Sequence, residues 1–180
     1  MKQVKRALAM LLCMAMVLSL CMVYAVAGNV CSEADIKGDA NTTVTFYITT
    51  KDKWKLSKDS IKLTATKGSL VYGTWSGGEK SDSTYGCYHV NVYKKSGGSW
   101  IKVKKSSFEW KNEESPKIKK LERSTDYKIV IEPYSIEEIG DTHKIRYSCS
   151  NLGGCSDLYW DSVPTWTISS TSKGIMTCSK

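Results

Sequence analysis

Hydrophobic and polar residues alternate one by one in several separate stretches of the chain. Between residues 41 and 50, Val44, Phe46 and Ile48 share one face of an extended backbone, while threonines and a tyrosine take the other face. The segments 61–66, 88–93 and 127–132 show the same period, with apolar faces made by Ile61, Leu63, Ala65, Tyr88, Val90, Val92, Tyr127, Ile129 and Ile131. The pattern predicts an all-β domain whose strands each bury one face.

Clusters of turn residues separate these strands. They occupy positions 76–78, 96–98, 113–116, 139–141 and 153–154. The sharpest signal is the stretch 94–100, where two lysines end a strand, Ser96-Gly97-Gly98 reverses the chain, and Trp100 begins the return strand. About seven short strands with turns at intervals of roughly 8–12 residues predict an antiparallel β-sandwich made of two sheets.

The first 27 residues do not share this pattern. A basic start containing Lys2 is followed from Ala7 by an almost uncharged apolar run, which ends in Ala25-Val26-Ala27. Basic, apolar and small-residue regions in this order are typical of a signal peptide. We therefore expect residues 1–27 to direct export and residues 28–180 to form a secreted, extracellular protein.

Two alternatives for the leader stay open. The apolar run is just long enough to cross a bilayer, so an uncleaved leader would anchor the protein to the outer face of the membrane. Lipidation at Cys21 is the second alternative, although the bulky Leu20 before it makes a poor cleavage site. All three interpretations place residues 28–180 outside the cytoplasm.

The rest of the chain is expected to form one domain. Residues 28–40 are an N-terminal extension, residues 41–180 a single β-sandwich domain, and residues 136–163 a long insertion before the last strand. The composition of the 180 residues excludes a multi-pass membrane protein, a coiled coil and a collagen-like chain. The net charge is +8, but arginine is scarce after the leader, so we expect no nucleic-acid partner.

Five cysteines remain once the leader is set aside, which allows two disulfides and one free thiol in an oxidising compartment. We expect a bond between Cys149 and Cys155, because the turn residues between them can bring the two β-carbons together. A second bond between Cys31 and Cys178 would tie the ends of the exported chain together and leave Cys87 free.

The sequence contains few candidate residues for metal binding or catalysis. A metal site made of Cys87, His89, His143 and Cys149 lacks the ligand spacing of the common zinc modules, so we expect no metal and no cofactor. A Cys87–His89 dyad would hold its two residues about 7 Å apart on one strand, beyond hydrogen-bond reach. The adjacent glutamate pairs lie in turn regions and are interpreted as solvated charges. We therefore expect a protein that is not an enzyme.

Leu121 and the run Thr125-x-Tyr127-x-Ile129-x-Ile131 stand at a spacing that resembles fibronectin type III domains, where strand E leads into strand F. The resemblance implies a corner at which the hydroxyl of Tyr127 is hydrogen-bonded to the backbone upstream. The polar residues 122–124 supply backbone groups for that bond.

The resemblance extends upstream. Tyr88-x-Val90-x-Val92-Tyr93 and the following Ser/Gly turn look like the family's strand C, and Trp75 matches its strand B core tryptophan. The similarity covers roughly residues 60–135, but Arg123 replaces the usual proline and the insertion is far longer than the family's loop. An immunoglobulin-like sandwich of another topology is the alternative. The residues that the resemblance makes structural are Trp75, Tyr88, Leu121 and Tyr127.

Aromatic residues and lysines supply the candidates for binding. Six tryptophans exceed what a core of this size uses, so a surplus could stack against sugar rings, and lysines crowd around the predicted hairpin. We expect a secreted or cell-surface binding module whose partner is an unknown extracellular protein or glycan, with membrane contact only through the leader. The alternatives are a carbohydrate-binding module and a protein that binds an anionic cell-wall polymer. The candidate ligand-binding residues are Tyr159, Trp160, Trp100, Lys94, Lys95, Lys102 and Lys104.

Overall fold

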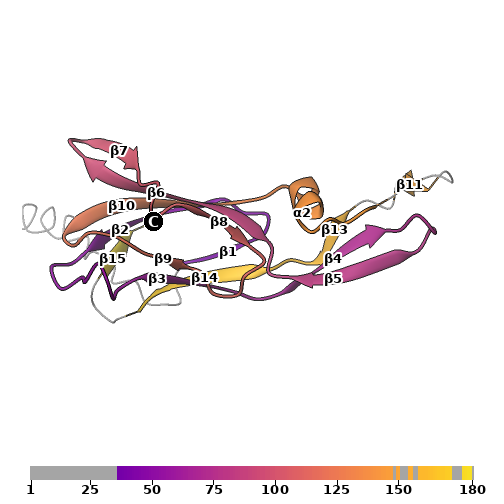
Figure 1. Cartoon of the computed structure of the whole chain (residues 1–180), viewed down its shortest axis with the longest axis horizontal. Coiled ribbons are helices and arrows are strands. Elements are labelled where there is room, and N and C mark those ends of the chain that lie inside the picture. The colour runs from indigo at the N-terminus through magenta and orange to yellow at the C-terminus, as the bar shows by residue number, and fades with distance from the viewer. Residues whose placement is uncertain (1–35, 148, 151–153, 156–157, 172–175, 180) are drawn as a thin grey trace, which may run out of the picture.

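The computed structural model describes most of the chain after the leader. The described residues are 36–147, 149–150, 154–155, 158–171 and 176–179. The predicted signal peptide, Cys21 and Cys31 lie outside them. Within the described residues the fold consists mainly of antiparallel strands (Figure 1), which confirms the all-β prediction.

One sheet, which we call the large sheet, holds three of the strands that alternation predicted. Its order is β15-β2-β10-β6-β7, with β8 also paired to β6. The alternating residues Phe46, Val90 and Ile129 are fully buried, so each of these three strands turns one face into the core. The strands of the large sheet are β2 (Val44–Thr50), β6 (Cys87–Ser96), β7 (Ser99–Lys102), β8 (Phe108–Lys111), β10 (Thr125–Pro133) and β15 (Met176–Ser179).

A second, small sheet has the order β1-β14-β3-β9. Its third strand is the predicted segment that contains Ile61 and Leu63, both fully buried. Ile36 and Ala40 are buried on either side of β1, so the last residues of the predicted N-terminal extension belong to the fold. The strands of the small sheet are β1 (Lys37–Asp39), β3 (Ile61–Ala65), β9 (Lys117–Ile118) and β14 (Thr165–Ser170).

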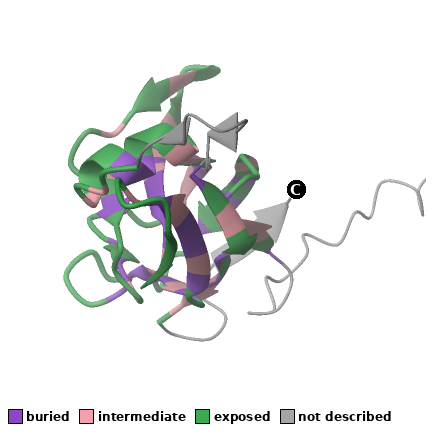
Figure 2. Ribbon diagram, turned by 90° about the vertical axis from the view of Figure 1, so that its right-hand side faces the viewer, coloured by how far each residue is buried: buried purple, intermediate pink, exposed green. Residues whose placement is uncertain are grey.

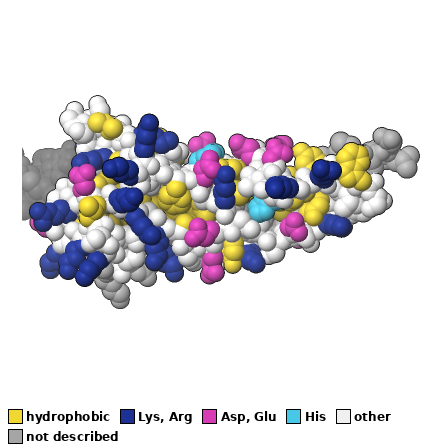
Figure 3. All heavy atoms as spheres, in the orientation of Figure 1, with side chains coloured by type: hydrophobic (Ala, Val, Ile, Leu, Met, Phe, Trp, Pro, Cys, Tyr) yellow, Lys and Arg dark blue, Asp and Glu magenta, His cyan; other side chains and the backbone are white. Residues whose placement is uncertain are grey.

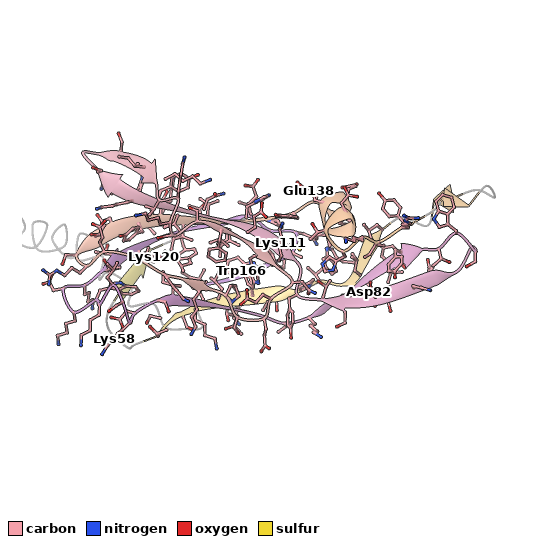
Figure 4. All side chains as sticks on the ribbon, in the orientation of Figure 1. Lys58, Asp82, Lys111, Lys120, Glu138 and Trp166 are labelled. Carbon is pink, nitrogen blue, oxygen red and sulfur yellow. The ribbon has the colours of Figure 1, made fainter. Side chains whose placement is uncertain are left out.

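Side chains from the two sheets pack into one hydrophobic core. The inward faces of β2, β6 and β10 and those of β3 and β14 contribute to the same cluster. Figure 4 shows Trp166 between the two layers of strands, and Figure 2 shows the buried residues on the inner strands with exposed hairpins and loops around them. The predictions that Tyr88, Leu121 and Tyr127 are structural are confirmed by their burial.

The predicted insertion contains regular structure and builds an arm at one end of the molecule (Figure 1). Helix α2 packs there over a second cluster that includes Leu70, Cys87, Ile139 and Leu158. The insertion therefore continues the core rather than forming a loose loop. The elements of the insertion are α2 (Ile136–Thr142), β11 (Cys149–Ser150), β12 (Gly154–Cys155) and β13 (Tyr159–Ser162). Strand β13 completes a three-stranded sheet of order β13-β4-β5 with two upstream strands, β4 (Gly68–Gly73) and β5 (Glu79–Thr84).

Helix α2 begins with a capping box. The hydroxyl of Ser135 accepts a hydrogen bond from the N–H of Glu138 at 3.2 Å, and the Glu138 carboxylate accepts one from the N–H of Ser135 at 2.8 Å. These bonds satisfy two backbone donors that a helix start otherwise leaves free. Glu138 therefore has a structural role beyond that of a solvated charge. Among the described residues, no helix is long and apolar enough to span a membrane.

The two cysteines expected to form a disulfide face each other in the short hairpin of the insertion. Cys149 is the register partner of Cys155 in the antiparallel pair of β11 and β12. The backbone arrangement agrees with a bond, and the bond itself stays a prediction because their side chains are not described. Cys31 lies outside the described residues, so its pairing with Cys178 of β15 also stays a prediction.

Trp75 is not a core residue, and that prediction is wrong. It lies in the turn between β4 and β5 and is 79% exposed. The N–H of Thr74 donates to the carbonyl of Gly78 at 2.8 Å, and Gly77 has a φ of +81°, so the chain reverses tightly here. Trp75 therefore sits in the turn that joins β4 to β5, with its side chain largely in solvent.

The predicted tyrosine corner is confirmed. The Tyr127 hydroxyl accepts a hydrogen bond from the N–H of Glu122 at 2.7 Å. Thr50, which is fully buried, strengthens the same corner because its hydroxyl donates to the carbonyl of Glu122 at 2.6 Å. The segment that leads into β10 is thus fixed to both β10 and β2.

Replacing Tyr127 with phenylalanine is expected to lower the free energy of unfolding by about 0.5–1.5 kcal/mol, because the change removes one hydrogen bond and little volume. Urea unfolding measures the effect. Tyr147→Phe is the matched control, since Tyr147 is 40% exposed and its loss of a hydroxyl is expected to have no measurable effect. Equal effects from the two substitutions would contradict a structural role for the corner.

Candidate binding surface on the outer face of the large sheet

The predicted hairpin between β6 and β7 is confirmed. Ser96 pairs with Ser99, and the two residues between them, Gly97 and Gly98, have φ angles of +54° and +87°. Positive φ at both central positions is the conformation of a two-residue type I′ turn, which glycine adopts without strain. The turn fixes the register of β7 and so decides which side chains of the hairpin share a face.

Four strands of the large sheet bring one residue each into a row on its outer face. Tyr47 pairs with Lys128, Lys128 with Tyr93, and Tyr93 with Lys102. The Lys128 ammonium lies 4.6 Å from the ring centre of Tyr93 and 5.8 Å from that of Trp100, and the rings of Trp100 and Tyr47 are 5.6 Å apart. These cation–π and aromatic contacts hold Lys128 in place on the surface. We call these five residues the aromatic–lysine row.

A pocket of about 390 Å³ adjoins this row. That volume lies within the range of roughly 300–1,000 Å³ that small-molecule sites occupy. Lys102 belongs to both the row and the pocket, so the two form one continuous surface. Six polar residues and a single apolar one line the pocket: His89, Asn91, Lys102, Lys104, Ser107, Glu109 and Phe108.

The charge in the pocket is positive. Glu109 is paired with Lys111 at 2.6 Å, and the hydrogen bond between them lowers the pKa of Glu109 and raises the pKa of Lys111. The only other ion pair among the described residues joins Lys94 to Glu122. Neither Lys102 nor Lys104 therefore has a carboxylate partner in the described part of the chain, and both are exposed to a ligand.

The structure brings four of the seven predicted binding residues together and separates the other three from them. Trp100 and Lys95 are register partners, and Lys102 and Lys104 line the pocket. Lys94 lies on the opposite face of β6, where its ammonium binds the carboxylate of Glu122, and this hydrogen bond raises its pKa. Lys94 therefore stabilises the Tyr127 corner and does not belong to the candidate surface.

Tyr159 and Trp160 do not join this surface. They belong to β13, toward the opposite end of the molecule from β7 (Figure 1). Trp160 is only partly exposed and packs against both core clusters, so its ring covers the core beneath the insertion. Tyr159 is 41% exposed, but the ring of Trp160 is turned into the core and does not form a stacking platform with it.

Cys87 has a histidine neighbour that sequence spacing did not indicate. Its sulfur lies 3.9 Å from Nε2 of His143, whereas His89 stacks on the ring of Tyr134. The same Nε2 lies 3.4 Å from the hydroxyl of Thr84. Cys87 is fully buried, and burial raises the pKa of its thiol. A protonated thiol enclosed in a core cluster fits packing rather than nucleophilic chemistry.

In the folded protein, the Cys87 thiol is expected to react with iodoacetamide at least about 100-fold more slowly than in urea, because reaction requires local or global opening. Peptide mapping by mass spectrometry separates Cys87 from the other cysteines. Rapid alkylation of Cys87 in the folded protein would contradict an enclosed thiol and would favour an enzymatic role for the Cys87–His143 pair.

Among the residues that the structure describes, no group of three or more His, Cys, Asp or Glu side chains is close enough to hold a metal ion. Figure 3 shows lysine and arginine side chains gathered over the half of the molecule that carries the β6–β7 hairpin, with acidic side chains nearer the middle.

A scan against models of known protein families and a search of curated proteins find no match to this chain.

Proposed function

We propose that the protein is an exported, non-enzymatic binding module that takes an acidic glycan on the aromatic–lysine row and its adjoining pocket. The observation that carries the proposal is the pair of exposed lysines, Lys102 and Lys104, at a pocket whose one carboxylate is already paired with Lys111. A carboxylate or sulfate on the ligand would supply the missing partner of these lysines.

The lining of the pocket favours a sugar as the carrier of that negative charge. Asn91 and His89 offer side-chain donors and acceptors for hydroxyl groups, and Phe108 offers an apolar surface for the carbon face of a ring. One face of the Trp100 and Tyr93 rings is turned toward Lys128, which makes the row better suited to an anionic glycan than to a neutral one.

We propose an immunoglobulin-like sandwich as the architecture that presents this surface. The shared core of the two sheets and the Tyr127 corner support the proposal. In immunoglobulin domains the late strand G shares one sheet with strands C and F. Here the late strand β14 pairs with β3 in the small sheet, and β10 is flanked by β6 and β2 in the large sheet. This strand order favours a sandwich topology different from that of fibronectin type III domains.

Calorimetry with a pair of oligosaccharides that differ only in a carboxylate tests the proposal. The uronic-acid form is expected to bind, and binding should weaken as salt is added. The double variant Lys102→Gln/Lys104→Gln is expected to lose at least about tenfold in affinity, since each charge-assisted hydrogen bond contributes about 1.5–3 kcal/mol.

Lys80→Gln is the matched control, because Lys80 is an exposed lysine on β5, in the arm. It should leave affinity unchanged. Equal affinity for the neutral and the acidic sugar, or equal losses from the control and from the pocket variant, would exclude this surface as an acidic-glycan site. Cleavage of the glycan during the titration would contradict the non-enzymatic part of the proposal.

A further inference from the structure

Two loops that are distant in sequence meet at one end of the molecule and carry a concentration of positive charge. One connects β2 to β3 (residues 51–60) and the other connects β9 to β10 (residues 119–124). The hydroxyl of Ser124 is hydrogen-bonded to the carboxylate of Asp52, which joins the two loops directly. We call this region the basic end. Its exposed cationic side chains are Lys51, Lys53, Lys55, Lys58, Lys119, Lys120 and Arg123.

The acidic residues of the basic end are engaged by nearby groups. Asp52 accepts the bond from Ser124, Asp59 accepts a hydrogen bond from the N–H of Lys55 at 2.6 Å, and Glu122 pairs with Lys94. The ion pairs found among the described residues include none of the seven cations of this end. Figure 4 shows Lys58 and Lys120 near the same end, and Figure 3 shows dark-blue side chains gathered there.

The first of these loops is held in place by a buried anchor. Trp54 is 3% exposed and belongs to the main core cluster, and its backbone N–H donates to the carbonyl of Lys51 at 2.9 Å. Two further backbone bonds, from the N–H groups of Lys58 and Asp59 to the carbonyl of Lys55, close the next turn at 3.0 and 2.8 Å. These bonds fix the position of the residues between them.

Leu56 lies in that closed turn and is 56% exposed. A single exposed leucine is ordinary on a protein surface. This one is unusual because it lies in a fixed turn, two residues from the buried Trp54 and between the exposed Lys55 and Lys58 of the same loop. Exposed lysines match the anionic headgroups of a membrane surface, and a projecting apolar side chain matches the acyl region beneath the headgroups.

We infer that the basic end docks on a membrane surface that contains anionic lipids, with its lysines among the headgroups and Leu56 at the boundary of the acyl chains. A soluble polyanion would satisfy the lysines but gives no role to Leu56. The inference stands apart from the proposed glycan site, because Lys102 and Lys104 are not part of the basic end.

Sedimentation with lipid vesicles tests the inference. The protein is used in the processed form that its producing cell releases, and the intact mass identifies that form. Vesicles of phosphatidylcholine alone are compared with vesicles that also contain phosphatidylglycerol. Binding is expected only to the anionic vesicles. Leu56→Ser should weaken it about tenfold, from the lost burial of a leucine, and Lys55→Gln/Lys58→Gln about thirtyfold, from two lost charges near the lipid surface.

Matched controls separate these effects from general charge and hydrophobicity. Ile101 is 57% exposed on β7, so Ile101→Ser removes the same exposed apolar character elsewhere and should leave vesicle binding unchanged. Lys102→Gln/Lys104→Gln should also leave vesicle binding unchanged, so failure of the glycan proposal and failure of this inference are distinguishable. Thermal unfolding of each variant verifies that the fold is retained.

The inference is overturned if Leu56→Ser binds the anionic vesicles as well as Ile101→Ser does. The inference is also overturned if soluble polyphosphate removes all variants from the vesicles equally, with no contribution from Leu56. That result would identify the basic end as a polyanion site. Absence of binding to phosphatidylglycerol vesicles by the unmodified protein would also overturn it.

Discussion

Replacing Trp166 with alanine is expected to lower the free energy of unfolding by about 3–5 kcal/mol, a larger effect than we expect from any other single substitution in this chain. Trp166 is fully buried and lies between the two sheets (Figure 4). Its ring also covers Gly38, where an added β-carbon would overlap the indole. Loss of the ring would leave a cavity next to β1, β3 and β14 together, because β14 pairs with both of the other strands.

Trp75→Ala is the control for this change, since it removes the same side chain from a position that is 79% exposed. Its effect should stay within about 0.5 kcal/mol. Denaturant unfolding followed by circular dichroism measures both variants. A loss at Trp75 equal to the loss at Trp166 would contradict the assignment of Trp166 to the core and of Trp75 to an exposed turn.

Trp166 and Trp75 also show why the fold is only partly predictable from the sequence. Strands whose residues alternate strictly, such as those containing Phe46 and Ile129, are identifiable because burial of one face leaves a period of two. Trp166 stands in such a run, with Ile168 buried on the same face of β14, whereas Trp75 lies in a turn outside any alternation. The identity of a tryptophan alone does not decide between core and surface. The turn residues Ser76-Gly77-Gly78 beside Trp75 are the better guide to its position.

Two elements of the arm illustrate opposite kinds of failure. Strand β5 is polar and exposed along most of its length, so no apolar periodicity marks it. Helix α2 is too short for a helical period but carries a readable signal in Ser135-x-x-Glu138, the sequence form of a capping box. The first element is formed by its pairing with the preceding strand β4 across the turn at residues 74–78, and the second is encoded locally in the capping box.

The candidate surface is predictable in composition and not in geometry. Alternation along β6 places Lys95 on the face of Tyr93 and Lys94 on the face of Val92, so the sequence alone could have set Lys94 apart. Lys128 could not have been found in this way. Its position beside Tyr93 depends on the register between β10 and β6, which the local sequence does not encode.

Gly68→Ala is expected to lower the free energy of unfolding by about 1–3 kcal/mol through overpacking, the second large effect. An added β-carbon would overlap the carbonyl oxygen of Ser162 and the ring of Pro164. Neither group can rotate away, because one is backbone and the other is a closed ring. The same stretch is fixed to β4 by the hydrogen bond from the N–H of Ser69 to the hydroxyl of Ser162 at 2.9 Å.

Gly78→Ala is the matched control, because the nearest atom to its added β-carbon would be the Thr74 hydroxyl oxygen at 3.7 Å, an ordinary contact. It should be neutral or stabilise the protein by up to about 1 kcal/mol. Thermal unfolding compares the two variants. If Gly68→Ala is as stable as Gly78→Ala, the chain between β13 and β14 does not lie against β4 as described. If it is destabilised, the close approach at Gly68 is one of the contacts that join the arm to the main core, beside the packing of Trp160 against both clusters.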